Sequence, residues 1–239
     1  MIRCFGLTDV GCSRLSNEDA FAVEPELGLF VVADGMGGAQ AGELASAIAI
    51  ETIVNGVRCS APTRTVEGLV AAIREANRSI LARAAENPDY QGMGTTVVAA
   101  LIDPPAAHIA SVGDSRLYLF RQGALERVTS DQTLVNEVGR SLGLTEEQIH
   151  THPFRNVLTM AVGARERIEV HSHELTLDAG DILLLCSDGL HGVVDDQELA
   201  QVLAAADRGL AETTADLIGR ARENGGPDNI TAVLVQNAP

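Results

Sequence analysis

The sequence contains no tryptophan and few aromatic residues, and its acidic residues outnumber its basic ones. Aromatic residues make up 3% of the 239 residues, so the core must be built mainly from Ala, Val, Ile and Leu. The 33 acidic and 17 basic side chains give a formal net charge of −16. That charge opposes binding to nucleic acids and to anionic membranes, both of which select basic patches. No run of about 18 apolar residues occurs, so we expect no membrane-spanning segment.

The cysteines indicate neither a disulfide framework nor a zinc site. Cys4, Cys12, Cys59 and Cys186 are scattered along the chain and form no C-x-x-C pair. Residues 1–4 lack the charged and apolar regions of a signal peptide. We therefore expect a cytoplasmic protein.

Strand-like and helix-like stretches alternate along the chain. Short, mostly apolar runs predict strands at residues 2–10, 20–24, 29–33, 96–102, 107–112, 116–121, 168–177, 182–186 and 230–236. Apolar residues at a spacing of three to four predict one pair of helices over residues 44–84 and a second pair over 199–221, with a break at Gly209. Because the outer face of each sheet needs a cover, this pattern predicts an α+β fold. Its centre is an antiparallel β-sandwich flanked by helix pairs in α-β-β-α layers.

One polar stretch interrupts the strands. Residues 130–156 contain a short amphipathic helix at about 134–142 and a second candidate helix starting at 145–147. We expect this stretch to form a surface flap beside the functional site. No linker rich in Pro, Gly or Ser divides the chain, so residues 1–239 are predicted to form a single domain.

Three aspartates border apolar strand-like runs. Asp34 follows the run 29–33, Asp188 follows 182–186, and Asp228 precedes 230–236. If these strands are antiparallel neighbours, the three carboxylates meet at one end of a sheet. Carboxylates about 4 Å apart repel each other by roughly 4 kcal/mol per pair at an effective dielectric constant near 20, so a fold gathers them only around a cation. The alternative is three unrelated turns, in which Asp and Gly are common.

Seven short motifs then occur in one order over nearly the whole chain. They are Asp9-Val10-Gly11, Arg14-x-x-Asn17-Glu18-Asp19, Ala33-Asp34-Gly35-Met36-Gly37-Gly38, Met93-Gly94-Thr95-Thr96, Val112-Gly113-Asp114-Ser115-Arg116, Ser187-Asp188-Gly189 and Asp228-Asn229-Ile230-Thr231. Together they resemble the metal-dependent serine/threonine protein phosphatases of the protein phosphatase 2C-like (PPM) family, in its compact bacterial form. Each motif alone is weak, whereas seven in order are specific.

The resemblance implies a binuclear site for Mg²⁺ or Mn²⁺. Its implied ligands are Asp34 bridging both ions, the Gly35 carbonyl on one, Asp188 and Asp228 on the other, and Glu18 and Asp19 holding metal-bound waters. Oxygen ligands suit these hard cations and argue against zinc. Two such ions activate a water near neutral pH and clamp a phosphoryl group for in-line attack. The implied function is hydrolysis of phosphoserine and phosphothreonine on proteins, opposing a Ser/Thr kinase.

Arg14 and Asp114 take further roles from the resemblance, each with an alternative. The guanidinium of Arg14 matches phosphate oxygens, and its place five residues before Asp19 lets both emerge beside the metals. Arg14 could instead be a surface residue that pairs with Glu18. Asp114 resembles the ligand of a weak third ion, although the sequence around it also suits a tight turn between two strands.

Four positions depart from the family pattern. Gly192 stands where relatives often have an acidic residue, which weakens the case for a third ion. Gln132 replaces a common His and Met160 a common Arg; both lie at or near the flap, so we expect them to affect substrate choice. Met36 replaces the His that some relatives carry as a proposed general acid, so the leaving group takes its proton from water or another group.

Two other functions fit the sequence less well. A catalytically silent pseudophosphatase acting as a binding module is disfavoured by the intact set of Asp34, Asp188 and Asp228. A phosphatase dedicated to an anti-sigma-factor antagonist is disfavoured because no sensor domain accompanies the motifs. The expected partners are phosphoproteins and a cognate Ser/Thr kinase, the expected oligomeric state is a monomer, and neither nucleic acid nor membrane is expected to bind.

Overall fold

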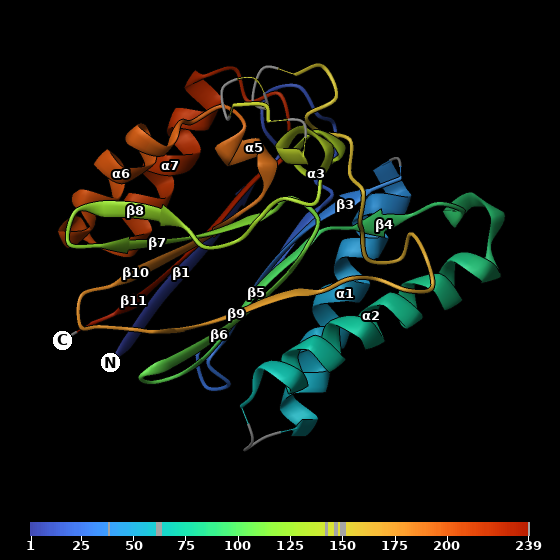
Figure 1. The fold of residues 1–239 in the computed structure, drawn as a ribbon, viewed down its shortest axis with the longest axis horizontal. Coiled ribbons are helices and arrows are strands. Elements are labelled where there is room, and N and C mark those ends of the chain that lie inside the picture. The colour runs from blue at the N-terminus through green and yellow to red at the C-terminus, as the bar shows by residue number, and fades with distance from the viewer. Residues whose placement is uncertain (38, 61–63, 142, 146–147, 149–151, 239) are drawn as a thin grey trace.

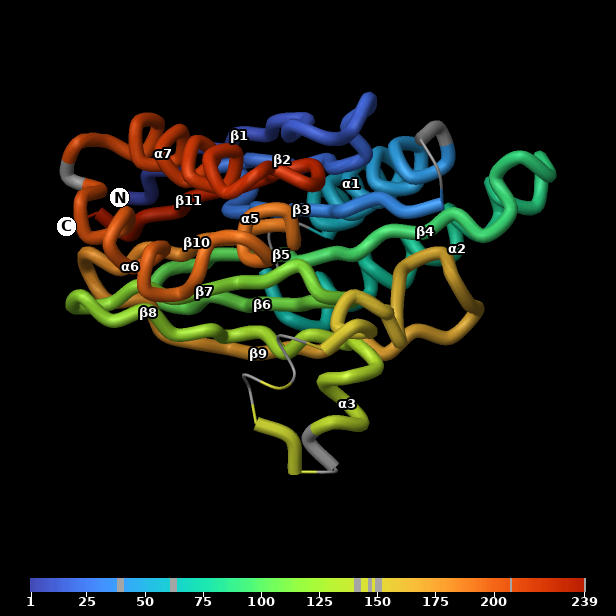
Figure 2. The backbone as a smooth tube through the Cα atoms, turned by 90° about the horizontal axis from the view of Figure 1, so that it is seen from above, coloured from blue at the N-terminus to red at the C-terminus, as the bar shows by residue number. Residues whose placement is uncertain are grey.

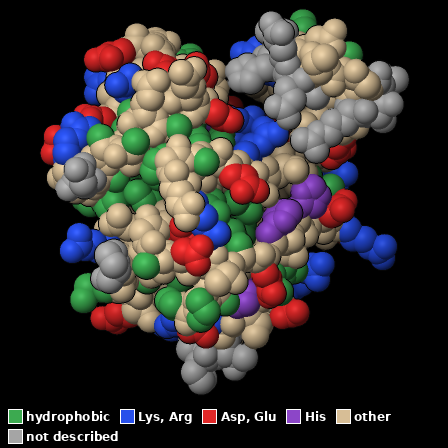
Figure 3. Space-filling model, turned by 60° about the vertical axis from the view of Figure 1, so that its left-hand side comes forward, with side chains coloured by type: hydrophobic (Ala, Val, Ile, Leu, Met, Phe, Trp, Pro, Cys, Tyr) green, Lys and Arg blue, Asp and Glu red, His purple; other side chains and the backbone are tan. Residues whose placement is uncertain are grey.

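Two stacked antiparallel sheets form the centre of the structure, and helices cover their outer faces (Figure 1). The computed structural model describes residues 1–37, 39–60, 64–141, 143–145, 148 and 152–238. Figure 2 shows the same layers from above, with α1 and α2 beside one sheet and α6 and α7 beside the other. On the face seen in Figure 3, acidic and basic side chains are interspersed.

Each sheet has a simple order of neighbouring strands, all of them antiparallel. The first sheet runs β1 (Ile2–Asp9), β11 (Ile230–Asn237), β10 (Ile182–Cys186), β7 (Arg116–Arg121) and β8 (Ala124–Arg127). The second sheet runs β2 (Asp19–Glu24), β3 (Leu29–Met36), β5 (Val97–Asp103), β6 (Ala106–Val112) and β9 (His171–Thr176), with β4 (Gly94–Thr95) paired to the end of β3.

The helices differ in their task. Two long ones, α1 (Ala39–Ser60) and α2 (Val66–Glu86), pack on the second sheet, and α6 (Asp196–Ala204) and α7 (Leu210–Glu223) pack on the first. The short helices are α5 (Asp188–His191), α3 (Leu134–Ser141), η1 (Pro88–Tyr90) and η2 (Ala206–Arg208). Within the described residues, none of the helices has the length and apolar composition needed to cross a membrane.

Side chains that point alternately to the two faces of each sheet form three hydrophobic cores, one between the sheets and one under each pair of helices. In β3, Val31 packs in the core under α1 and α2, whereas its neighbours Phe30 and Val32 pack between the sheets. In β10, Leu184 packs under α6 and α7, whereas Leu183 faces the space between the sheets. Successive side chains of a strand point to opposite faces, so a strand buried on both sides has to be apolar throughout.

The predicted α+β class, with an antiparallel sandwich and outer helix pairs, is confirmed. Strands β7 and β10 have the predicted bounds, whereas β9 omits residues 168–170 and Leu177. Strands β4 and β8 and helix α5 were not predicted. Helix α3 begins where expected and is described to Ser141; Leu142 and residues 146–147 of the second candidate helix lie outside the described residues.

The condition that the three aspartate-bearing strands are antiparallel neighbours is met by two of them. Strands β10 and β11 are antiparallel neighbours in the first sheet, so Asp188 and Asp228 flank one sheet end. Strand β3 lies in the second sheet, and Asp34 therefore reaches the other two carboxylates across the sandwich.

Candidate metal centre and active site

Asp34 and Asp188 are each placed by a buried strand that stops at the same end of the sandwich. Strand β10 is five buried residues long and ends at Cys186, after which α5 begins at Asp188. Asp34 sits near the end of β3, where its amide donates to Thr96 Oγ1 at 3.1 Å and its carbonyl accepts from the amide of Thr96 at 2.8 Å. These backbone bonds fix the position of Asp34 at the end of β3.

Burial and mutual repulsion make the carboxylate cluster hard to ionise. Burial, and then the charges of Asp19 and Asp188, raise the pKa of Asp34 well above its usual range. The pKa of Asp188 is raised by burial and by the charge of Asp228, and the pKa of Asp114 is raised well above its usual range by burial and by the charge of Asp188. Buried carboxylates stay ionised only where positive charge compensates them.

Two buried carboxylate oxygens lack any partner among the described residues. They are Oδ1 of Asp19 and Oδ1 of Asp188. The other oxygen of Asp19 is well held, because it accepts from Ser187 Oγ at 2.7 Å and from Thr231 Oγ1 at 2.6 Å. Burial nevertheless raises the pKa of Asp19 to about 7. Orphaned buried oxygens are rare in proteins, and here they mark where a bound water or cation would complete the shell.

The donor set therefore fits a hard cation. Every candidate ligand is an oxygen, and magnesium in particular keeps several waters when bound by a few carboxylates. Among the described residues, no group of three or more His, Cys, Asp or Glu side chains is placed to hold an ion on its own.

Gly35 is required by close backbone packing. A Cβ at this position would stand 2.1 Å from the carbonyl oxygen of Gly42 and 2.6 Å from that of Glu18. The Gly35 amide donates to that same Glu18 carbonyl at 3.1 Å. Glu18 itself is buried, and burial raises the pKa of its carboxyl group. The end of β3 is thus pressed between α1 and the start of β2, which brings the Gly35 backbone and Glu18 together.

Arg14 pairs with Asp228 rather than with Glu18. Its Nη2 donates to Asp228 Oδ2 at 2.7 Å, and 49% of its side chain is exposed. The loop that carries Arg14 is ordered by Asn229, whose Nδ2 donates to the carbonyls of Val10 and Ser16 at 3.0 and 2.9 Å. The alternative that Arg14 is a surface residue paired with Glu18 is therefore wrong about the partner. Arg14 lies at the candidate metal centre.

Asn229 and His191 were given no role by the sequence. Asn229 also accepts from the amide of Glu18 at 2.8 Å, so one amide side chain joins the loops of Arg14, Glu18 and Asp228. His191 follows Asp188 in α5, and its Nε2 donates to the backbone carbonyl of Asp114 at 3.0 Å. Burial and the nearby charge of Arg116 lower the pKa of His191 to about 3. The imidazole is therefore neutral, and it supports the backbone at Asp114 through its hydrogen bond. These roles rest on contacts that become visible only once the fold is known.

Gln132, which the sequence led us to expect to affect substrate choice, has a different role in the structure. Its side chain is 2% exposed, accepts from the amide of Gly113 at 2.8 Å and donates to the carbonyl of Glu169 at 3.1 Å. A buried amide of this kind holds the turn that precedes Asp114. The side chain of Gln132 faces the protein interior, so it acts on the turn and not on a substrate.

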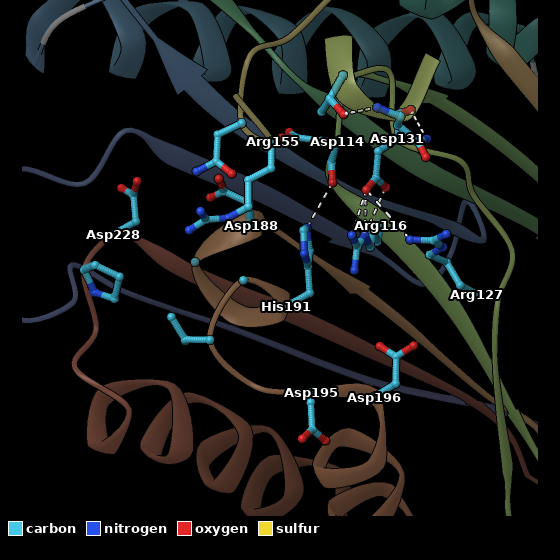
Figure 4. Close-up of a pocket in the computed structure, with 17 residues that line it drawn as sticks. Asp114, Arg116, Arg127, Asp131, Arg155, Asp188, His191, Asp195, Asp196 and Asp228 are labelled. Atoms are coloured by element: carbon cyan, nitrogen blue, oxygen red, sulfur yellow. Dashed lines mark hydrogen bonds and ion pairs between the residues drawn. The ribbon is translucent and has the colours of Figure 1, made fainter. Parts of the chain in front are cut away.

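A cavity of about 400 Å³ opens beside these residues. Figure 4 shows Asp188 and Asp228 at one end, Arg155 above them, and Arg116 and Asp131 at the opposite side. The cavity is larger than one phosphoryl group needs, so the site can admit part of a larger molecule.

The chain belongs to the protein phosphatase 2C family, whose model matches residues 13–234. The serine/threonine phosphatase stp of Listeria innocua is 36% identical over 236 residues, which cover 96% of this chain and 93% of the relative. The crystal structure of the Mycobacterium tuberculosis serine/threonine phosphatase PstP/Ppp superposes with a TM-score of 0.93 at 34% identity, covering 100% and 99% of the two chains. The catalytic domain of PstP in complex with two manganese ions has a TM-score of 0.86 at 34% identity, covering 98% and 97%. The resemblance carried by the seven motifs is confirmed.

Proposed function

We propose that this chain is a metal-dependent protein-serine/threonine phosphatase with two Mg²⁺ or Mn²⁺ ions. The observation that carries the proposal is the buried carboxylate cluster around Asp34 and Asp188, with an unpartnered Oδ1 on Asp188 and raised pKa values. The relatives named as Ser/Thr phosphatases, and the one solved with two manganese ions, support the same function.

Each residue of the site has a proposed task. The ions would be held by Asp34, the Gly35 carbonyl, Asp188 and Asp228, with Glu18 and Asp19 binding their waters and Asp114 a weak third ion. When bound, such ions supply an activated water near neutral pH and neutralise phosphoryl charge. Arg14, already beside Asp228, donates to phosphoryl oxygens with its forked guanidinium. Ser187 and Thr231 fix one oxygen of Asp19, which leaves the other, buried and without a partner among the described residues, to bind a metal-bound water.

The proposed substrates are phosphoproteins of a cognate Ser/Thr kinase. We further propose that residues 1–239 form one phosphatase domain that acts as a cytoplasmic monomer, with residues 130–156 as its flap. The core shared by both sheets supports a single folding unit, because Phe30 of one sheet and Leu183 of the other pack in the same cluster.

Hydrolysis of a small aryl phosphate tests the proposal. We expect turnover with manganese, no turnover with excess EDTA, and a loss of several orders of magnitude in Asp34→Asn at saturating metal. Circular dichroism of Asp34→Asn should match the wild type. A wild type that binds manganese but hydrolyses no phosphomonoester would instead support the pseudophosphatase.

A further inference from the structure

The flap contributes an arginine to the cavity beside the metal centre. Arg155 lines this cavity together with Asp188 and Asp228, and Figure 4 shows its side chain extending from the flap toward them. The guanidinium of Arg155 makes no hydrogen bond or ion pair with any residue that the structure describes. Arg116, in the same cavity, differs because its Nη2 donates to Asp131 Oδ2 at 2.7 Å.

Backbone hydrogen bonds anchor the segment that carries Arg155. Its amide donates to the carbonyl of His152 at 3.1 Å, and the amide of Val157 donates to the carbonyl of Phe154 at 3.1 Å. The amide of Leu134, at the start of α3, donates to the carbonyl of Val157 at 2.8 Å. The chain around Arg155 is therefore a turn tied to the first residue of α3, and it delivers the guanidinium to one side of the cavity.

A ligand lying between Arg155 and the carboxylates would explain the position of Arg155. A guanidinium that faces several carboxylates across an open cavity would ordinarily close an ion pair with one of them. Arg155 faces Asp188 and Asp228 without pairing with either. The space between them suits a dianion that meets cations at both ends, namely ions held by the carboxylates and the guanidinium of Arg155.

We propose that Arg155 donates hydrogen bonds to the phosphoryl oxygens of the substrate, as a second guanidinium beside Arg14. The assignment rests on the proposed phosphatase function and deepens it, because it makes the flap part of phosphate recognition. Arg14 approaches from the loop after β1 and Arg155 from the flap, so the two reach the phosphoryl group from different elements. The recognised group is a phosphomonoester dianion, whatever chain carries it.

Inorganic phosphate and a small aryl phosphate are the probes, because neither has residues that flank the phosphoryl group. In Arg155→Ala we expect the inhibition constant of phosphate and the KM of the aryl phosphate both to rise about tenfold, which is the size expected for a hydrogen bond between charged groups. We expect kcat to fall less, and Arg155→Lys to recover part of the loss, since a point charge lacks the fork. Arg167→Ala is the matched control: it removes one exposed arginine that does not line the cavity, and both constants should stay within twofold.

Two outcomes would overturn the assignment. Both constants could be unchanged in Arg155→Ala, or only the KM of a phosphopeptide could rise, which would assign Arg155 to residues flanking the phosphorylated one. Calorimetric binding of phosphate to the manganese-loaded variants tests Arg155 separately from turnover. If the wild type binds phosphate through Arg155 but hydrolyses no ester, the proposed function fails while this assignment stands.

Discussion

Replacing Asp188 by Asn should stabilise the metal-free protein and remove the part of its stabilisation by manganese that comes from the ion Asp188 would hold. The carboxylate of Asp188 has a buried oxygen without a partner among the described residues, and its pKa is raised by burial and by the charge of Asp228. Asn keeps the shape of the side chain and removes its charge. A residue with a purely structural role would lose stability in this exchange, so the sign of the change is informative.

The expected size follows from the charges around Asp188. Two unit charges 4 Å apart repel each other by about 4 kcal/mol at an effective dielectric constant of 20. Raised pKa values show that protonation relieves part of this repulsion in the cluster, so we expect Asp188→Asn to gain about 1–3 kcal/mol, or about 2–10 °C in Tm for a chain of this size. Manganese at a hundredfold excess over its Kd should stabilise the wild type by about 2.7 kcal/mol per site, or about 5–10 °C.

Both effects are measured by thermal unfolding at about pH 7.5, once in EDTA and once in manganese. Asp89→Asn is the charge-matched control, because Asp89 is an exposed residue of η1 that does not line the cavity. We expect this control to melt like the wild type and to keep the full response to manganese. If Asp188→Asn melts below the wild type in EDTA and gains as much stability from manganese as the wild type does, Asp188 is not a ligand and the reasoning is refuted.

Two further substitutions test the neighbouring residues. Arg14→Ala should raise the KM of a phosphorylated substrate with a smaller fall in kcat, and Arg14→Lys should recover only part of the loss; an unchanged KM would leave Arg14 with a structural role. Asp131→Asn should cost about 3–5 kcal/mol at pH 7, because it leaves the buried Arg116 without its partner. Burial raises the pKa of Asp131, but hydrogen bonds from Arg116 outweigh it and lower the pKa overall; the stabilisation is therefore present above about pH 4 and lost below it, so urea unfolding of wild type and variant should converge in acid. A difference in stability that is the same at pH 7 and pH 3 would contradict the pair.

The sequence predicted the elements better than their assembly. Local apolar runs located β7 and β10 to the residue, since a strand buried on both faces is apolar throughout. The same property hides which sheet a strand joins, because both faces look alike. The sequence therefore could not tell whether β3 neighbours β10 and β11, and it belongs to the other sheet.

The site was predictable where one residue carries its own chemistry. Asp34, Asp188 and Asp228 stand at or next to strand ends, and that position alone identified them as candidate metal ligands. Asn229 and His191 work through hydrogen bonds to backbone groups far along the chain, and no local pattern encodes such partners. Long-range contacts of this kind become visible only once the fold is known.

Gly192 offers the sharpest test of how the backbone limits the metal centre. The family resemblance implies an acidic residue at this position, so Gly192→Asp would be expected to complete a third ion site with Asp114. The structure shows an obstacle: the Gly192 amide donates to the carbonyl of Asp188 at 2.7 Å, and a Cβ would stand 2.7 Å from that same oxygen. Any side chain at position 192 therefore pushes on the backbone of a candidate ligand.

We expect wild-type activity to keep rising into the millimolar range of manganese, because a third site anchored mainly by Asp114 binds its ion weakly. Gly192→Ala should raise the manganese concentration for half-maximal activity and cost about 1–3 kcal/mol of stability, since overpacking strains the turn. Gly192→Asp carries the same strain plus a carboxylate, so the difference between the two variants isolates the charge. If Gly192→Ala matches the wild type in both manganese titration and Tm, the turn tolerates a side chain and the steric argument fails. If it is impaired while Gly192→Asp needs less manganese than the Ala variant, the carboxylate binds the third ion and the glycine reflects the shape of this turn.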